Sequence, residues 1–198
     1  MNISTYKTKE NNHYKKDKDT NLFFNSTYYS SNKNSYIGQF SSKLPLSEIL
    51  NSKFEKEITE NFEPEFLNFI LNFEVLLDKD SYIEKKLFSL FNENKHVTSH
   101  WFSNIYCQYA DNSFVLVNLL KIIAKIHDVK PYETISQFKI FVLAALNNKN
   151  IEVKDFALQV FELWDDKSVL KALENIPPLN PAWLESYRQA IISELMSR

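Results

Sequence analysis

Apolar residues recur at every third or fourth position through most of the chain after residue 43, which is the spacing of one face of an α-helix. The first such series is Leu46, Ile49, Leu50, Phe54 and Ile58, and comparable series follow it to the end of the chain. The pattern predicts an all-α fold. The expected helices lie near residues 45–58, 64–77, 80–91, 99–109, 111–127, 133–146, 151–164, 167–175 and 181–195.

Prolines and small polar residues indicate where these helices begin, because they favour the first turn and the N-cap position. The expected start residues are Pro45, Pro64, Asp80, Thr98 or Ser99, Asp111, Asn150 or Ile151, and the pair Asn180 and Pro181. Helix starts recur about every 15 to 20 residues, so a helical hairpin repeats about every 35 to 40, within the range of α-solenoids. Short connections make each helix antiparallel to the one before it.

The most apolar stretch, residues 114–126, is interrupted by Asn118, Lys121 and Lys125. Their spacings of three and four place the three side chains on one polar stripe of a helix. Because the stretch is interrupted and is shorter than the roughly 20 residues of a membrane span, no transmembrane helix is expected.

Residues 1–43 differ in composition, since they are rich in Asn, Ser, Lys and Tyr and poor in aliphatic residues. Such a segment buries too little apolar surface to offset the entropy of ordering it, which predicts a largely disordered tail before a folded domain at residues 44–198. Its aromatic pairs, Phe23-Phe24 and Tyr28-Tyr29, either dock on the folded domain or form a sticky peptide for a partner.

A more specific pattern stands at residues 148–176, with the sequence NKNIEVKDFALQVFELWDDKSVLKALENI. Its defining positions are Val153-Lys154, Ala157, Val160, Trp164, Asp165-Asp166, Val169, Leu170 and Leu173. This stretch resembles a single HEAT repeat, with Lys154 where the family usually has arginine. The ending NPAWLESYRQAIISEL looks like the terminal helix after such repeats in small bacterial proteins. The resemblance covers residues 148–198, and the upstream helices fit by spacing. It implies a HEAT-like α-solenoid that acts as a scaffold or binder.

The single glycine, Gly38, precedes the helical region. Phosphate-binding loops, nucleophile elbows and tight β-hairpins need glycine where φ is positive or where the backbone approaches a ligand. P-loop ATPases, Rossmann enzymes and α/β-hydrolases are therefore not expected.

Charge and cysteine content limit the cellular compartments and the classes of partner that are expected. The net charge is −2, so the chain has no global attraction to phosphate backbones, and nucleic acid is disfavoured. One cysteine, Cys107, excludes an intrachain disulfide, and the polar N-terminus lacks the apolar stretch of a signal peptide. A cytoplasmic protein is expected.

Three histidines and the cysteine are the candidates for chemistry. His96 and His100 are spaced to place two metal ligands on one helical face, with Cys107 seven residues later. No HExxH motif or cysteine pair accompanies them, and a helix that begins after Thr98 or Ser99 would leave His96 outside it. Cys107 is interpreted as a buried small hydrophobe, and His127 as a side chain favoured by the helix dipole. No catalytic residue, metal or cofactor is predicted.

The candidate partner-binding residues are acidic or aromatic and belong to the last hairpins: Glu152, Asp155, Glu162, Asp165, Asp166, Trp164 and Trp183. If the carboxylates share one face, that face suits a basic partner, and tryptophan is enriched at binding hot spots. The alternative is that the carboxylates cap helices and the tryptophans pack in the core.

These observations favour a non-enzymatic protein-binding module. One concrete version is an immunity protein that neutralises a cognate, basic bacterial toxin domain. The alternatives are a subunit or adaptor of a larger assembly, and a HEAT-like nucleic-acid-binding protein, which would need a basic concave groove.

Overall fold

The computed structural model describes residues 45–198. The predicted tail at residues 1–43 lies outside the described residues. Within them the fold is all-α, as the sequence pattern predicts. The elements are α1 (Leu46–Asn61), α2 (Glu63–Asn72), α3 (Tyr82–Glu93), α4 (Lys95–Gln108), α5 (Ser113–Val129), α6 (Pro131–Ala145), α7 (Ile151–Trp164), the 3₁₀-helix η1 (Lys167–Val169), α8 (Leu170–Glu174) and α9 (Ala182–Ser197).

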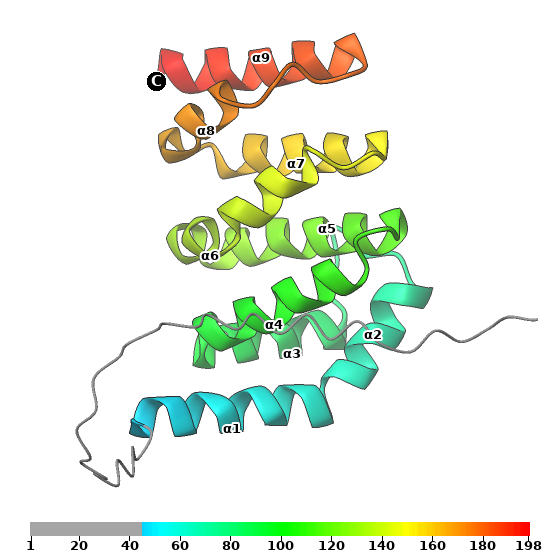
Figure 1. The fold of residues 1–198 in the computed structure, drawn as a ribbon, viewed down its shortest axis with the longest axis vertical. Coiled ribbons are helices and arrows are strands. Elements are labelled where there is room, and N and C mark those ends of the chain that lie inside the picture. Colours follow the sequence, from blue (N-terminus) through cyan, green and yellow to red (C-terminus); the bar gives the residue numbers. More distant parts are fainter. Residues whose placement is uncertain (1–44) are drawn as a thin grey trace, which may run out of the picture. The chain divides into compact units, whose positions relative to one another are not determined.

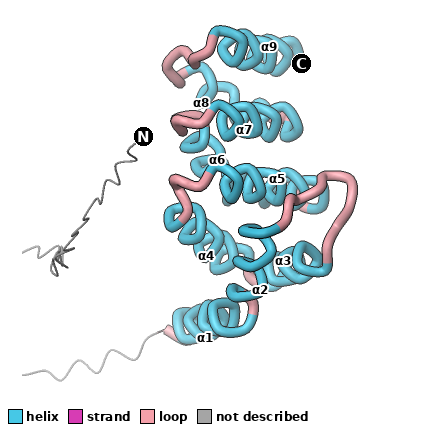
Figure 2. The backbone as a smooth tube through the Cα atoms, turned by 90° about the vertical axis from the view of Figure 1, so that its right-hand side faces the viewer, coloured by secondary structure: helices cyan, strands magenta, loops and turns pink. Residues whose placement is uncertain are grey.

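The helices pack in adjacent pairs that stack on one another (Figure 1). Turned by 90°, the stack shows two layers, with α4, α6 and α8 in one and α5, α7 and α9 in the other (Figure 2). Helix α5 packs against α2, α6 and α7, so it lies at the centre of the described residues.

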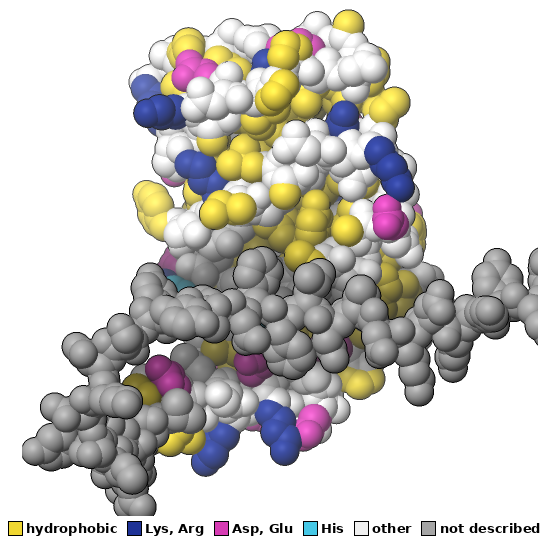
Figure 3. Space-filling view, in the orientation of Figure 1, with side chains coloured by type: hydrophobic (Ala, Val, Ile, Leu, Met, Phe, Trp, Pro, Cys, Tyr) yellow, Lys and Arg dark blue, Asp and Glu magenta, His cyan; other side chains and the backbone are white. Residues whose placement is uncertain are grey.

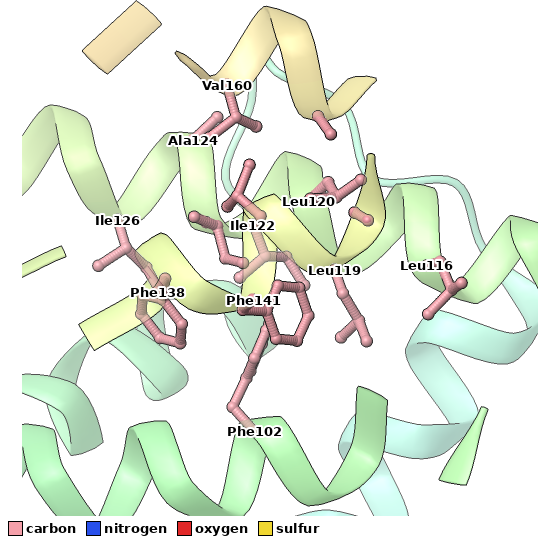
Figure 4. Packing of buried hydrophobic residues seen from close by; sticks show 14 of the residues in the cluster. Phe102, Leu116, Leu119, Leu120, Ile122, Ala124, Ile126, Phe138, Phe141 and Val160 are labelled. Atoms are coloured by element: carbon pink, nitrogen blue, oxygen red, sulfur yellow. The ribbon is translucent and has the colours of Figure 1, made fainter. Parts of the chain in front are cut away.

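Helix α5 forms the middle of the core, because residues 115–127 are all buried. Figure 4 shows its side chains Leu119 and Ile122 directed toward Phe102 of α4 and toward Phe138 and Phe141 of α6. The ring centroids of Phe102 and Phe138 are 5.4 Å apart, in an edge-to-face arrangement. Fully burying such a side chain stabilises the fold by about 1.5–3 kcal/mol, so this cluster is a major source of stability.

Several helix starts differ from the predicted ones because another side chain makes the cap. Ser81, not Asp80, caps α3: it forms a capping box in which its hydroxyl accepts from the Glu84 N–H and its own N–H donates to the Glu84 carboxylate. Two further corrections are Asn94, which caps α4 in place of Thr98 or Ser99, and Asn112, which caps α5 in place of Asp111. Asn150 caps α7 as predicted.

Two apolar series are less buried than their spacing indicates. Leu46 and Leu50 of α1 are 71% and 55% exposed, Phe54 is partly buried against the core, and Ile58 is fully buried. Helix α2 ends at Asn72, so Phe73 and Leu77 lie beyond it rather than on its face. Among the described residues, no helix combines the length and the apolar character needed to cross a membrane.

Candidate binding surface

Three of the predicted acidic residues share the exposed side of α7. Asp155 and Glu162 lie two turns apart, next to α9, and the Tyr187 hydroxyl donates a hydrogen bond to the Glu162 carboxylate. Burial, followed by the negative charges of Glu162 and Asp155, raises the pKa of Tyr187. Glu152 is exposed in the first turn of the same helix. We call Glu152, Asp155 and Glu162 the α7 carboxylates.

The other two predicted carboxylates do not join them, because they serve the turn after α7. Asp165 ends α7 with a left-handed backbone conformation (φ 46°), which aspartate tolerates better than most residues, and its side chain pairs with Arg198. Asp166 caps η1, where its carboxylate accepts from the Ser168 N–H at 2.6 Å.

The two candidate tryptophans lie in different environments. Trp164 is buried and packs edge-to-face on Phe161 at 5.4 Å, which is a core position rather than a place on a docking surface. Trp183 of α9 is 51% exposed and is therefore open to a partner.

The candidates for chemistry do not assemble into a site. His96 and His100 both belong to α4, contrary to a start at Thr98 or Ser99, and both are exposed. Cys107 is exposed, so its interpretation as a buried hydrophobe is wrong. Among the described side chains, no three His, Cys, Asp or Glu residues converge to hold a metal ion. His127 is buried, and its burial lowers its pKa.

The polar stripe of α5 contacts the loop at residues 73–81, which connects α2 to α3. The Asn118 side chain uses both ends of its amide: its Oδ1 accepts from the Val75 N–H at 3.0 Å, and its Nδ2 donates to the carbonyls of Ile70 at 3.1 Å and Phe73 at 2.9 Å. The Ile70 carbonyl is one of the groups left without a partner at the end of α2. Asn118 therefore stabilises both the last turn of α2 and the first residues of the loop.

The two lysines of the stripe hold the rest of the loop. Lys121 Nζ lies 2.7 Å from a Glu74 carboxylate oxygen. Lys125 Nζ donates to the carbonyls of Leu76 at 2.9 Å and Lys79 at 2.5 Å, and pairs with Asp80 at 2.9 Å and Glu84 at 2.6 Å. Because these partners span both ends of the loop, the stripe fixes its backbone at several points.

The side chains of this segment point outward. Leu71, Phe73, Leu76 and Leu77 are 37%, 56%, 50% and 49% exposed, and only Val75 of the loop is buried. Figure 2 shows the loop as the long connection that projects from the layer of α5. We call Phe73, Leu76 and Leu77 of the loop, together with Leu71 at the end of α2, the apolar loop residues.

The opposite side of the stack also exposes apolar residues, but without such a support. Tyr132 and Ile140 of α6 are 82% and 83% exposed. Tyr132 and Ile140 line one pocket with Ile135, and the space-filling view of that side shows apolar side chains among polar ones (Figure 3). As exposed apolar side chains away from the loop, Tyr132 and Ile140 serve as the comparison for the apolar loop residues.

Sequence reasoning missed this loop, because it assigned Phe73 and Leu77 to a helical face. The available signal was the stripe itself: three polar residues inside the most apolar stretch of the chain. No protein-family model, curated protein or solved structure matches the chain.

Proposed function

We propose that residues 45–198 form a HEAT-like stack of helical hairpins that acts as a non-enzymatic module for binding another protein. The observation that carries the proposal is the loop at residues 73–81. Asn118 and Lys125 fix its backbone and Lys121 holds its Glu74 side chain, while Phe73, Leu76 and Leu77 stay exposed. The stacked helix pairs and the pattern at residues 148–176 support the HEAT-like assignment.

Stability alone does not account for two lysines in the core. Burying a charge is costly, and apolar residues of similar volume often serve a core equally well or better. The polar side chains instead make the conformation of the loop specific, since each bonds to particular backbone or carboxylate groups of the loop. We therefore assign to the stripe the role of holding the loop in one conformation.

A second clamp in the same fold shows the contrast. The buried Arg188 of α9 donates to the carbonyls of Leu173 and Ile176, and so fixes the connection between α8 and α9. In that connection Leu179 turns into the core and is 8% exposed. In the α2–α3 loop the fixed backbone directs leucines and a phenylalanine to the surface instead, which suits a docking element.

The apolar loop residues provide enough surface for a specific contact. Fully burying one leucine or phenylalanine is worth about 1.5–3 kcal/mol, so four half-exposed side chains offer roughly 3–6 kcal/mol before the cost of association. A loop already fixed in one conformation loses little entropy on binding, which lowers that cost.

The test compares a loop variant with a matched surface variant in the native host. Tagged wild-type protein, Leu76→Ser/Leu77→Ser and Tyr132→Ser/Ile140→Ser are purified at moderate salt, and the proteins that accompany them are quantified by mass spectrometry. We expect a stoichiometric protein with the wild type and the α6 variant, and its loss with the loop variant. A partner that the loop variant retains in full would refute the proposal.

Two narrower versions follow from the same experiment. An immunity protein would bring down a basic toxin domain, and an adaptor would bring down the subunits of an assembly. Co-purified nucleic acid with salt-sensitive binding in a gel shift would favour the nucleic-acid alternative.

A further inference from the structure

The outward charges of the loop and α7 are mostly negative, with Lys79 as the exposed basic residue of the loop. Glu74 is 63% exposed while its partner Lys121 is 9% exposed, and Asp80 is 43% exposed while Lys125 is 6% exposed, all measured on side chains. Each pair is neutral in total, but the lysine faces the core and the carboxylate faces solvent. The Lys121 ammonium also holds the pKa of Glu74 below its usual value, so that carboxylate stays ionised.

The α7 carboxylates add to this charge. Within residues 45–198, no lysine or arginine forms an ion pair with Glu152, Asp155 or Glu162. Asp155 accepts instead from the Gln159 amide at 2.9 Å, and Glu162 from Tyr187. Their charge is therefore available to a partner.

Lys121 joins the two elements into one surface. Its ammonium contacts Glu74 of the loop and also lies 5.0 Å from the centre of the Phe156 ring of α7. The α2–α3 loop and α7 lie on the same side of the stack (Figure 2), although about 80 residues separate Glu74 from Asp155 in the chain.

We infer that one protein partner contacts both elements, and that it offers an apolar surface bordered by lysine or arginine. The apolar loop residues meet the apolar surface, and the basic border meets Glu74, Asp80 and the α7 carboxylates. This inference rests on the proposed function and adds the chemistry of the partner. Charge complementarity favours a protein over a membrane, because outward carboxylates are repelled by anionic lipid headgroups.

The test uses three synthetic helical peptides of equal length as probes. One has leucine on one face of the helix and lysine on the opposite face, the second has glutamine in place of lysine, and the third keeps the lysines but has serine in place of leucine. Their dissociation constants with the full chain are measured by fluorescence anisotropy at low and at high salt. We expect the leucine–lysine peptide to bind about tenfold more tightly than either other peptide, with an advantage that shrinks in high salt.

Paired variants separate the inference from the proposed function. Glu152→Gln/Asp155→Asn should remove most of the advantage of lysine over glutamine, whereas Glu133→Gln/Glu174→Gln on α6 and α8 should not. Leu76→Ser/Leu77→Ser should remove the advantage of leucine over serine, whereas Tyr132→Ser/Ile140→Ser should not. Circular dichroism of each variant confirms that it has folded.

The possible results separate the inference from the proposed function. If the leucine–glutamine peptide binds through the loop as tightly as the leucine–lysine peptide, the basic border is overturned and the proposed function stands. If no peptide distinguishes the loop variant from the α6 variant, both claims fail. Loop-dependent sedimentation with phosphatidylcholine vesicles, in place of peptide binding, would assign the loop to a membrane and overturn the inference.

Discussion

Replacing Lys125 by methionine removes one ammonium group from the core while keeping the length of the side chain. The ammonium has four acceptors: the carboxylates of Glu84 and Asp80 and the carbonyls of Leu76 and Lys79. Asp80 is half exposed and regains water, but Glu84 is 1% exposed and cannot. Breaking a buried pair in this way costs about 3–5 kcal/mol, a large part of the roughly 5–15 kcal/mol by which a domain is stable.

A double-mutant cycle isolates the pair. Glu84→Gln removes the charge, yet its amide oxygen still accepts from the Ser81 N–H that completes the cap of α3. In the double variant Glu84→Gln/Lys125→Met no charge is left unpaired between these two positions, so we expect a loss of only about 1–2 kcal/mol. The coupling energy between the two positions is then about 2 kcal/mol or more.

Urea unfolding followed by tryptophan fluorescence measures these free energies, because Trp101 and Trp164 are buried and report the loss of the core. Limited proteolysis with chymotrypsin, which cleaves after Phe and Leu, reports the loop separately, and Lys125→Met should be cut faster near Phe73 and Leu76. The reasoning is refuted if Lys125→Met costs less than about 1 kcal/mol, or if the double variant loses the sum of the two single losses.

Three further changes test other parts of the fold. Partial burial raises the pKa of Glu185, but hydrogen bonds from Arg188, Leu179 N–H and Gln189 bring the pKa to about 2. The ionised Glu185 therefore stabilises the fold above pH 4.5, and this stabilisation is lost as the pH falls toward 2. In acid unfolding curves, Glu185→Gln should reduce that loss by up to about 3 kcal/mol. Burial lowers the pKa of His127 below 6.5, so the unfolded chain binds this proton more readily than the folded chain. The free energy of unfolding should therefore fall as the pH drops below 6.5. In urea unfolding at pH 7 and pH 5.5, His127→Phe should show a smaller difference between the two free energies than the wild type. Asn150→Ala removes the acceptor for the Glu152 and Val153 N–H groups and should lower the free energy of unfolding by about 1 kcal/mol. Thermal unfolding measures this loss, and Asn147→Ala at an exposed position should not show it.

Local signals predicted the helices well wherever the decisive contacts are local. The start of α7 at Asn150 and the apolar spacing of α5 depend on neighbouring residues, and both agree with the structure. The cap of α3 also has a local signal, since Ser81 and Glu84 have the spacing of a capping box, and Ser81 rather than the predicted Asp80 makes the cap.

The end of α2 could not be predicted in this way. Residues 66–77 continue the helical spacing. The helix nevertheless ends at Asn72, where Asn118, more than forty residues later in the chain, donates hydrogen bonds to the carbonyls of Ile70 and Phe73. The polar stripe on α5 is visible in the sequence, but the neighbouring residues do not indicate which segment of the chain it contacts. The five predicted acidic residues come together only in part, because Asp165 and Asp166 lie past the end of α7 and stabilise the turn that follows it.

The stripe on α5 also bears on how this chain can change over generations. Its hydrogen bonds reach positions 41 to 49 residues earlier in the sequence, so a substitution on α5 alters the loop as well as the core. By these free energies, an apolar residue at position 125 should be least destabilising when the carboxylate at position 84 is lost with it. In related chains these two positions should therefore vary as a pair, while the outward positions 76 and 77 are free to follow a changing partner.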